Sequence, residues 1–352
     1  MLSLLWPSEA ASQFSQAVPG RLFAFPKDHG KHPDFLTEWW YFTGNLESKT
    51  GRWGFQLTFF RRSLVKVPPT RRSQWTVRDL YPAHFALTDI SNRRFFHTEL
   101  ISREGPGLAS AARDDLHVRV RDWSAARQGE QIRINVRERD YSLNLKLVSG
   151  KPPVLHGHGG YSRKSDSEGQ ASYYYSLTRL LASGTVTFQG VSHDVTGSAW
   201  MDHEFGSSIL HQDQVGWDWF SLQLDDGSEF MVFRLRKKDG SFERPFGTFV
   251  PPEGPPVYLY DQPVEFRATG TWTSPHTGAV YPSGWSIVAA GLNLNVKISP
   301  ALQDQELASG ASTSIIYWEG SVEAEGSRDG KPVTGRGYVE LTGYAHSLGG
   351  RL

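Results

Sequence analysis

Alternation of apolar and polar residues with a period of two is the feature that most restricts the fold of this chain. Successive side chains of a β-strand point to opposite faces, so this period is typical of a strand with one buried face. Gly, Pro, Asn, Asp or Ser bound the alternating segments, which favours antiparallel hairpins. Helical periodicity is nearly absent, and we predict an all-β chain. The clearest segments are Trp53–Phe60, Leu116–Val120, Gln131–Val136, Tyr141–Val148, Gly184–Phe188, Phe220–Leu224, Phe230–Leu235 and Leu292–Ile298.

Two blocks of sequence recur in the same order, which indicates an internal duplication. Trp39–Thr43 (WWYFT) matches Trp217–Ser221 (WDWFS), and Val195–Gly197 matches Val333–Gly335 (both VTG). The position numbers of the first match differ by a constant offset (217 − 39), and those of the second by a smaller one (333 − 195). Each copy therefore begins with an aromatic strand and ends with a strand that carries the VTG motif. A repeated unit of this size is typical of a β-barrel, because closing an antiparallel sheet removes its exposed edges.

The duplication also predicts domain boundaries. We expect the two copies to span about residues 37–206 and 215–345, joined by a linker at about residues 206–214. A barrel of eight strands has room for a small apolar ligand. The predicted parts are an N-terminal extension at residues 1–22, a first barrel with extra loops (66–75 and 152–169) at residues 23–210, and a second barrel at residues 211–352.

Charge and cysteine content exclude several classes of protein. The 37 Lys and Arg residues balance the 37 Asp and Glu residues, so the chain lacks the basic excess typical of nucleic-acid-binding proteins. There is no cysteine, which excludes disulfides, zinc–thiolate sites, iron–sulfur sites and thiol nucleophiles. The sequence also has no G-x-S-x-G elbow, so nothing in it indicates a serine hydrolase.

Two pairs of histidines have spacings at which both rings could reach one metal ion. His29 and His32 are three residues apart, and His156 and His158 are two residues apart. Zinc sites usually have three or four ligands, and neither pair has a third ligand at a recognisable spacing. We therefore expect loop histidines that bond to backbone or water, with no metal and no cofactor.

Asp202, His203 and Glu204 are the best candidates for acid–base chemistry. They lie at the end of a predicted strand, flanked by Trp200 and Phe205. Without a bulge, alternation along the strand places Asp202 and Glu204 on one face and His203 on the other. Burial beside aromatic rings raises the pKa of a carboxyl group, so that it can donate a proton near neutral pH.

The aromatic blocks suggest a partner for such an acid. Trp39, Trp40, Trp217 and Trp219 supply indole faces, whose negative π-surface can stabilise a carbocation. Together with a buried acid, they suit protonation of an alkene without a cofactor. A structural interpretation stays open, in which Trp39 and Trp217 plug the barrel ends and the acidic block satisfies backbone groups at a domain junction.

Longer blocks of the sequence resemble the AttH and hydroxyneurosporene-synthase family, over about residues 23–345. The resemblance implies two tandem lipocalin-like (calycin) antiparallel β-barrels and an apolar or amphipathic ligand. In this family, carotenoid 1,2-hydratases add water across a terminal isoprenoid double bond without a cofactor, and fungal relatives cyclise polyketide chains. The blocks are FPKDHGKHPDFLTEWWYFTGNL, GYSRKSDSEGQASYYYSLTRL, VTGSAWMDHEFG, GWDWFSLQL, YWEGSVEAEG and GYVELTGY.

The resemblance also indicates site residues. Asp202, His203 and Glu204 match a family motif and are the predicted catalytic group. The predicted ligand-binding residues are Glu38, Trp39, Trp40, Tyr174, Trp217, Asp218 and Trp219.

Two functions fit these residues. The first is binding of a lipid or isoprenoid in a barrel or interdomain cleft, with a role in lipid or isoprenoid metabolism or transport. The second is a cofactor-independent hydratase or cyclase. In that enzyme Asp202 or Glu204 is the general acid, His203 orients it or activates water, and Trp40 and Trp219 line the cation. A partner-docking module is a third alternative, which an exposed apolar patch would favour.

The opening residues, Met1–Pro7, are too short for the apolar core of a signal peptide, so two alternatives stay open: the protein is cytosolic, or an export signal has been trimmed. Exported members are common in the family, so the resemblance favours a periplasmic or membrane-associated protein. The expected partner is a small hydrophobic ligand, with association to a membrane or export system and no nucleic acid.

Overall fold

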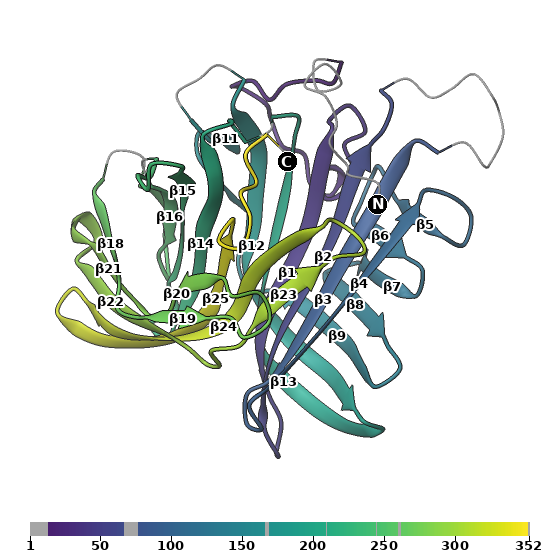
Figure 1. The fold of residues 1–352 in the computed structure, drawn as a ribbon. Helices are drawn as coiled ribbons and strands as arrows, with labels where there is room; N and C mark the ends of the chain where they lie inside the picture. The colour runs from purple at the N-terminus through teal and green to yellow at the C-terminus, as the bar shows by residue number, and fades with distance from the viewer. Residues whose placement is uncertain are drawn as a thin grey trace. The chain divides into compact units, whose positions relative to one another are not determined.

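The first sheet has thirteen strands and curves into a nearly closed barrel (Figure 1). The computed structural model describes residues 13–66, 77–165, 169–208, 210–243, 245–259 and 262–350. The strand order is β4-β3-β2-β1-β13-β12-β9-β8-β7-β6-β5, and β10 and β11 pair with β12. The strands are β1 (Thr37–Glu47), β2 (Arg52–Ser63), β3 (Asp79–Asp89), β4 (Arg94–Arg103), β5 (Ala109–Ala111), β6 (His117–Val120), β7 (Trp123–Gln128), β8 (Gln131–Arg137), β9 (Tyr141–Ser149), β10 (Val154–Leu155), β11 (Tyr161–Arg163), β12 (Ala171–Phe188) and β13 (Val191–Gly206).

The second sheet has ten strands, in the order β17-β16-β15-β14-β25-β24-β22-β21-β18 with β23 beside β24. A separate two-stranded sheet joins β19 and β20. The all-β class that the sequence predicts is confirmed. These strands are β14 (Gln214–Leu224), β15 (Glu229–Lys237), β16 (Phe246–Val250), β17 (Val257–Tyr258), β18 (Val264–Ala268), β19 (Thr271–Thr273), β20 (Val280–Pro282), β21 (Trp285–Ala289), β22 (Leu294–Pro300), β23 (Glu306–Ser309), β24 (Ile315–Arg328) and β25 (Lys331–Thr342).

The chain forms two compact units, and the main boundary between them lies near the end of β13. The first unit comprises residues 1–86, 97–208 and 311–313, and the second comprises residues 87–96, 209–310 and 314–352. Of the two extra loops predicted for the first barrel, 152–169 contains β10 and β11, whereas most of 66–75 lies outside the described residues.

Helical structure in the described residues consists of two short 3₁₀ turns, η1 (Lys27–His29) and η2 (Ala290–Leu292). None of the described helices is long and apolar enough to cross a membrane. The predicted start of the strand Leu292–Ile298 is wrong, because Leu292 belongs to η2 and Asn293 adopts a left-handed conformation (φ 48°). The strand begins at Leu294.

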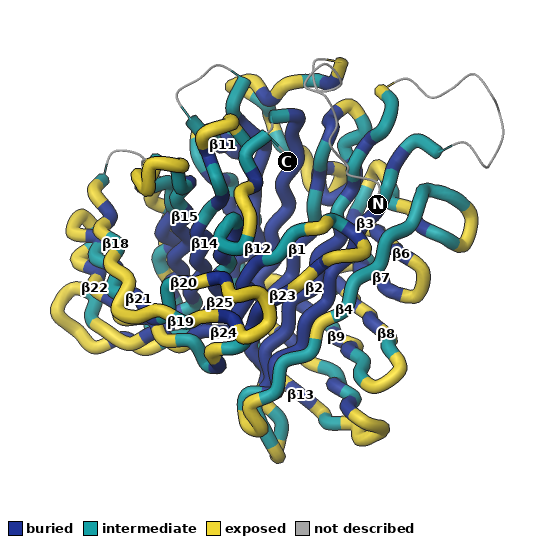
Figure 2. Tube along the Cα trace, viewed as in Figure 1, coloured by how far each residue is buried: buried dark blue, intermediate teal, exposed yellow. Residues whose placement is uncertain are grey.

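Ladder register defines which face of the first sheet is the inside of the barrel. Ile132 and Leu147 are almost fully buried and lie opposite each other on β8 and β9. Leu147 also pairs with Ala182, Ala182 pairs with Gly197, and Gly197 pairs with Leu46. Since opposite residues share a face, even-numbered residues of β1 and odd-numbered residues of β13 point inward. Figure 2 shows that residues 199–206 of β13 are buried throughout.

The second unit has its own apolar core. Phe220, Leu222, Trp285, Trp318 and Leu341 belong to one buried cluster. Burial of apolar surface contributes about 25 cal/mol per Å² to the free energy of folding, so this cluster stabilises the second unit.

The glycine of the VTG motif has the same surroundings in both units. A Cβ atom on Gly197 would lie 2.1 Å from the backbone oxygen of Asn45, and one on Gly335 would lie 2.6 Å from the backbone oxygen of Gln223. β1 pairs with β13 and β14 pairs with β25. Asn45 and Gln223 are separated by the first of the two sequence offsets, and Gly197 and Gly335 by the second. The matching blocks therefore occupy equivalent positions in the paired strands of the two units.

Candidate functional site

Glu38 is a completely buried carboxylate on the inward face of β1. Arg61, opposite it on β2, donates from Nε to Glu38 Oε2 (2.8 Å) and from Nη1 to Asp79 Oδ1 (3.2 Å). Burial alone would raise the pKa of Glu38. The charge of Arg61 and hydrogen bonds from His203 and His32 instead hold that pKa well below its usual value. Glu38 is therefore ionised.

Two histidines bond to the same oxygen of Glu38. His203 Nε2 lies 2.9 Å and His32 Nδ1 lies 2.8 Å from Glu38 Oε1, and His32 Nε2 lies 2.9 Å from Asp28 Oδ1. Burial would lower the pKa of His32, but its hydrogen bonds to the two carboxylates raise it. Burial lowers the pKa of His203 and outweighs its bond to Glu38. The two carboxylates thus favour the imidazolium form of His32, whereas burial favours the neutral form of His203.

Tyr175 extends this network to His29. The Tyr175 hydroxyl lies 3.1 Å from His203 Nδ1 and 2.6 Å from His29 Nδ1. Burial raises the pKa of Tyr175 well above its usual value and lowers the pKa of His29 to about 4, so both are neutral at pH 7. His29, His32, Glu38, Tyr175 and His203 are called the inward cluster below.

Aromatic rings fix the imidazoles of the inward cluster. The Trp40 ring stacks on His203 with centroids 4.9 Å apart, and its Nε1 donates to the backbone oxygen of His29 (3.0 Å). The Phe205 ring stacks on His32 at 3.5 Å with an interplanar angle of 6°. Side chains held in this way lose little conformational entropy when a ligand binds.

Asp202 lies on the opposite face of β13 and is buried in a different set of donors. Tyr174 Oη donates to Asp202 Oδ2 (2.8 Å), Trp200 Nε1 donates to Oδ1 (2.5 Å), and the Ser176 hydroxyl also donates to Oδ1. Burial raises the pKa of Asp202 to about 7 and outweighs these hydrogen bonds. Asp202 thus has the property that the sequence predicts for a buried carboxyl group, a proton that it can give up near neutral pH.

His156 completes the surroundings of Asp202. Its Nε2 lies 2.6 Å from Ser176 Oγ, its ring lies 4.3 Å from that of Tyr174, and its backbone N–H donates to Tyr174 O (3.0 Å). Burial lowers the pKa of His156 to about 3, so its imidazole is neutral. Asp202, Tyr174, Ser176, Trp200 and His156, called the Asp202 cluster below, therefore contain no permanent charge.

Glu204 has different partners from Asp202, although both point to the same face. Lys164 Nζ lies 2.7 Å from Glu204 Oε1, and Ser172 Oγ donates to the same oxygen (2.5 Å). Glu204 thus has a lysine as its ion-pair partner, whereas Asp202 accepts hydrogen bonds only from uncharged donors among the described residues.

Strand geometry separates the predicted catalytic residues as alternation requires. Asp202 and Glu204 share one face, whereas His203 points into the barrel and bonds to Glu38. His203 therefore does not orient Asp202, because the pleat of β13 turns their side chains apart. Trp40 is also on the inward face, so it cannot line a cation beside Asp202. Trp39, opposite Glu204 on β1, shares the face of Asp202.

Three predicted ligand-binding residues, Trp217, Asp218 and Trp219, lie in the second unit. Asp218 is fully buried and accepts hydrogen bonds from Arg234 Nη2 (2.9 Å) and Arg236 Nη1 (2.8 Å). Asp218 points to the core side of β14, so Trp217 and Trp219 point to the other face. The interpretation of the tryptophans as barrel plugs is therefore wrong for Trp217, and equally for Trp39.

A metal ion is a second chemical use of the inward cluster. His32, Glu38 and His203 place three ligand atoms within 4.8 Å of one another, and two imidazoles with a carboxylate can bind zinc or iron. However, the His32 backbone N–H lies 3.1 and 3.0 Å from the two oxygens of Glu38, and Arg61 occupies Oε2. A cation would have to displace these donors beside a guanidinium group. The residues therefore do not fit a metal centre.

Several residues in the two clusters, or bonded to them, were not predicted as site residues. Arg61, Tyr175 and Ser176 carry central hydrogen bonds, and His29 and His32 were considered only as metal ligands. The Tyr173–Tyr175 run and its neighbour Ser176 are visible in the sequence, but the pairing of β12 with β13 is needed to place them beside residues 202 and 203.

These features define a class of protein, a lipocalin-like all-β chain whose first sheet carries a buried cluster of titratable residues on each of its two faces. The family model described as AttH-like matches residues 16–344. The chain therefore belongs to the AttH-like family, and the resemblance found in the sequence is confirmed. The search of curated proteins returns no match.

Solved structures agree with this assignment. A protein from Nitrosomonas europaea described as an AttH is 38% identical, with a TM-score of 0.83 over 94% of this chain and 100% of that chain. Kievitone hydratase from Nectria haematococca is 15% identical, with a TM-score of 0.71 over 95% of this chain and 97% of that chain. CghA with Sch210972 is 14% identical, with a TM-score of 0.56 over 90% of each chain. The last two similarities show a shared fold.

Proposed function

We propose that this protein is a cofactor-independent hydratase or cyclase, and that it protonates an alkene of an apolar isoprenoid or polyene. The proton donor is Asp202. The observation that carries the proposal is the environment of this carboxyl group, which is buried and has no cationic partner among the described residues. A pKa of about 7 lets Asp202 hold a proton at neutral pH and release it in the reaction.

The hydrogen bonds favour Oδ2 as the oxygen that carries the proton. An indole N–H can only donate, so the bond from Trp200 keeps Oδ1 of Asp202 as an acceptor. The hydroxyl of Tyr174 can donate or accept, so it tolerates a proton on Oδ2. Protonation of one alkene carbon by Oδ2 leaves a cation on the other carbon, which either water or a second double bond of the same molecule attacks. The first outcome is hydration and the second is cyclisation.

Ser176 and His156 offer a route for the returning proton. The Ser176 hydroxyl bridges Asp202 Oδ1 and His156 Nε2. Aromatic rings of Trp39 and Tyr174 lie on the same face and can stabilise positive charge. The proton donor, the route for the returning proton and the rings that stabilise the cation are therefore all side chains of the chain itself.

Relatives support the reaction class. Kievitone hydratase shares the fold and is named as a hydratase, and the family resemblance includes cofactor-independent hydratases and cyclases. The function predicted first was that of a carrier, which binds a lipid or isoprenoid without reaction. A carrier would bind the same class of apolar ligand, so only a turnover assay distinguishes it from the proposed enzyme.

The test begins with organic extraction of the purified protein and mass spectrometry of the extract, which identifies a co-purified ligand. That ligand, or a panel of terminal isoprenoid alkenes and polyenes in detergent, is then incubated with the protein in ¹⁸O-labelled water. Hydration adds one labelled water to the product, whereas cyclisation leaves the mass unchanged and alters the retention time.

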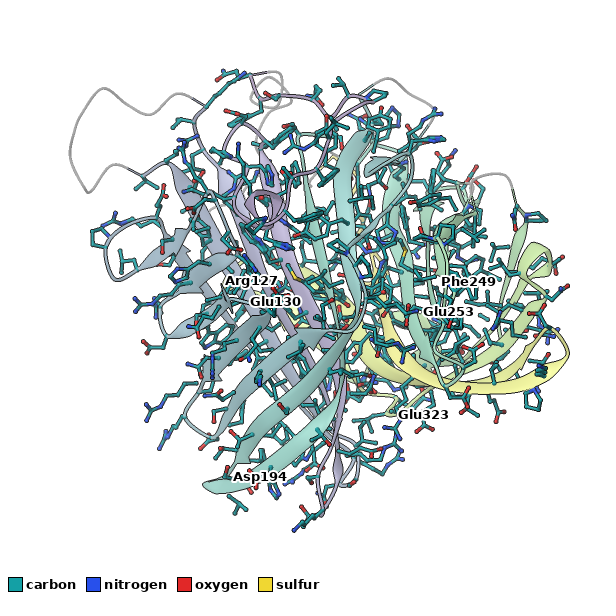
Figure 3. The ribbon with its side chains drawn as sticks, turned by 180° about the vertical axis from the view of Figure 1, so that it is seen from behind. Arg127, Glu130, Asp194, Phe249, Glu253 and Glu323 are labelled. Atoms are coloured by element: carbon teal, nitrogen blue, oxygen red, sulfur yellow. The ribbon has the colours of Figure 1, made fainter. Side chains whose placement is uncertain are left out.

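Asp202→Asn provides the decisive comparison. We expect it to retain ligand affinity and to lose turnover by about 10²-fold or more, the usual contribution of a general acid. Asp194→Asn, an exposed carboxylate on the same strand (Figure 3), should turn over normally. Binding with no turnover in the wild-type protein would support the carrier function instead.

A further inference from the structure

The inward cluster contains a chain of hydrogen bonds that the proposed reaction does not use. It runs from His29 through Tyr175 and His203 to Glu38, with separations of 2.6, 3.1 and 2.9 Å. All four side chains are buried. The inward and opposite faces of the sheet are separate, so this chain is distinct from the Asp202 cluster.

The direction of every hydrogen bond in the chain follows from its fixed end. Glu38 is ionised and can only accept, so His203 donates to it from Nε2. A neutral imidazole has one N–H, so His203 Nδ1 accepts, and the hydroxyl of Tyr175 donates to it. The Tyr175 oxygen then accepts from His29 Nδ1. Because His29 is also neutral, its Nε2 carries a lone pair and no proton.

That lone pair is available to a ligand. Among the described residues none bonds to His29 Nε2, and the residue retains 7% exposure. Besides Tyr175, which bonds to its Nδ1, the charged or titratable groups that act on the pKa of His29 are His203, Asp115, Arg127 and Asp28. Asp115 forms an ion pair with Arg127, which Figure 3 labels, with 2.8 Å between Oδ2 and Nη2, and the two residues act on the pKa of His29 in opposite directions.

Aromatic surface borders the imidazole ring of His29. The Phe25 ring lies 4.7 Å from the His29 ring and 4.9 Å from the Tyr175 ring, and Phe25 is 37% exposed. Because Phe25 packs on the His29 ring and is itself partly exposed, a ligand that bonds to His29 would contact aromatic surface, which favours an apolar ring.

We propose that His29 is a ligand-recognition residue, whose Nε2 accepts a hydrogen bond from a hydroxyl group on an apolar, ring-containing molecule. Cooperative hydrogen bonding along the chain polarises Nε2 and strengthens it as an acceptor. Tyr175, His203 and Glu38 are positioning residues that keep the proton of His29 on Nδ1. This proposal does not rest on the reaction assigned to Asp202.

The first test reads the tautomers directly. In ¹⁵N-histidine-labelled protein at pH 7, NMR should show His29 protonated at Nδ1 and His203 protonated at Nε2. Tyr175→Phe removes the acceptor for His29 Nδ1 while keeping the ring, and should release His29 from the Nδ1–H form. A proton on His29 Nε2 in the wild-type protein would overturn the proposal.

The second test measures recognition with 2-naphthol and 2-methoxynaphthalene, which differ in the hydrogen-bond donor. Binding of 2-naphthol should shift the His29 Nε2 resonance. The wild-type protein should prefer 2-naphthol by about five- to tenfold, the effect of one hydrogen bond, and His29→Phe and Tyr175→Phe should reduce this preference to less than about twofold. The preference should persist from pH 8 to pH 5, since the pKa of His29 is about 4.

Controls separate this site from overall folding and from Asp202. His117→Ala, at an exposed histidine on β6, should keep the full preference. Asp202→Asn should keep it as well, so loss of turnover and loss of recognition are independent results. Equal affinity for the two probes in the wild-type protein, or no shift at His29, would refute the proposal.

Discussion

Replacement of Asp202 by Asn should change the pH dependence of stability in a way that identifies the protonated acid. Burial raises the pKa of Asp202 from 3.8 to about 7 in the folded protein. Between these two pH values the folded state holds a proton that the unfolded state has released. The wild-type protein therefore loses stability as the pH rises through this window.

The size of the effect follows from the pKa difference of about 3. One pKa unit corresponds to 1.36 kcal/mol, so ionising Asp202 costs the fold about 4 kcal/mol by pH 8. Asparagine cannot ionise and keeps an oxygen for the donors Trp200 and Ser176, while its amide can face Tyr174. The free energy of unfolding of Asp202→Asn, relative to wild type, should thus increase by about 4 kcal/mol between pH 4 and pH 8.

Urea unfolding followed by tryptophan fluorescence at each pH from 4 to 8 measures this difference. Asp194→Asn, the exposed control on β13, should give a profile parallel to wild type. If Asp202→Asn were also parallel to wild type, Asp202 would not hold its proton to neutral pH. Its role as the general acid would then be refuted.

Three further substitutions test the inward cluster and the sheet. Arg61→Met leaves Glu38 without its buried cation and should lower the free energy of unfolding by about 3–5 kcal/mol in urea at pH 7; a loss below about 1 kcal/mol would contradict the ion-pair assignment. Because the pKa of Glu38 is lowered in the fold, its carboxylate stabilises the protein above the unfolded-state pKa, and this contribution is lost as the pH falls. Acid titration should accordingly show the stability deficit of Glu38→Gln shrinking below about pH 4. Gly197→Ala places a Cβ 2.1 Å from a backbone oxygen of β1 and should cost about 1–3 kcal/mol in thermal or urea unfolding, whereas Gly310→Ala, in open space, should cost almost nothing.

Local patterns in the sequence predict the strands well where one face is exposed. The predicted segments Gln131–Val136 and Tyr141–Val148 differ by one residue from β8 and β9, because apolar residues alternate there with exposed polar ones. β12 is harder to predict, since most of its residues up to Leu180 are buried and its register shifts between Leu177 and Leu180. Burial of both faces removes the alternation.

Alternation also predicts that Asp202 and His203 face opposite sides of β13. The partners of these side chains could not be predicted, because they come from distant segments. His203 is 165 residues from Glu38, and His29 is 146 residues from Tyr175. Only the strand order, with β13 between β1 and β12, brings such residues together.

The matching registers also bear on the origin of the two units. We propose that they descend from one duplicated unit and have since diverged in their ionisable residues. At the same two sequence offsets, Glu38 corresponds to Gly216 and His203 corresponds to Leu341. The inward cluster would then be specific to the first unit.

The alternation of side chains along β13 restricts how this protein can evolve. Insertion or deletion of one residue before Asp202 would exchange the two faces, moving the acid into the barrel and His203 out of it. Both clusters would be lost in one step. Changes of length are better absorbed in the turn between β12 and β13, where Gln189 and Gly190 have positive φ angles of 49° and 79°. Homologues should therefore vary in length at this turn and keep an invariant spacing from there to Asp202 and His203.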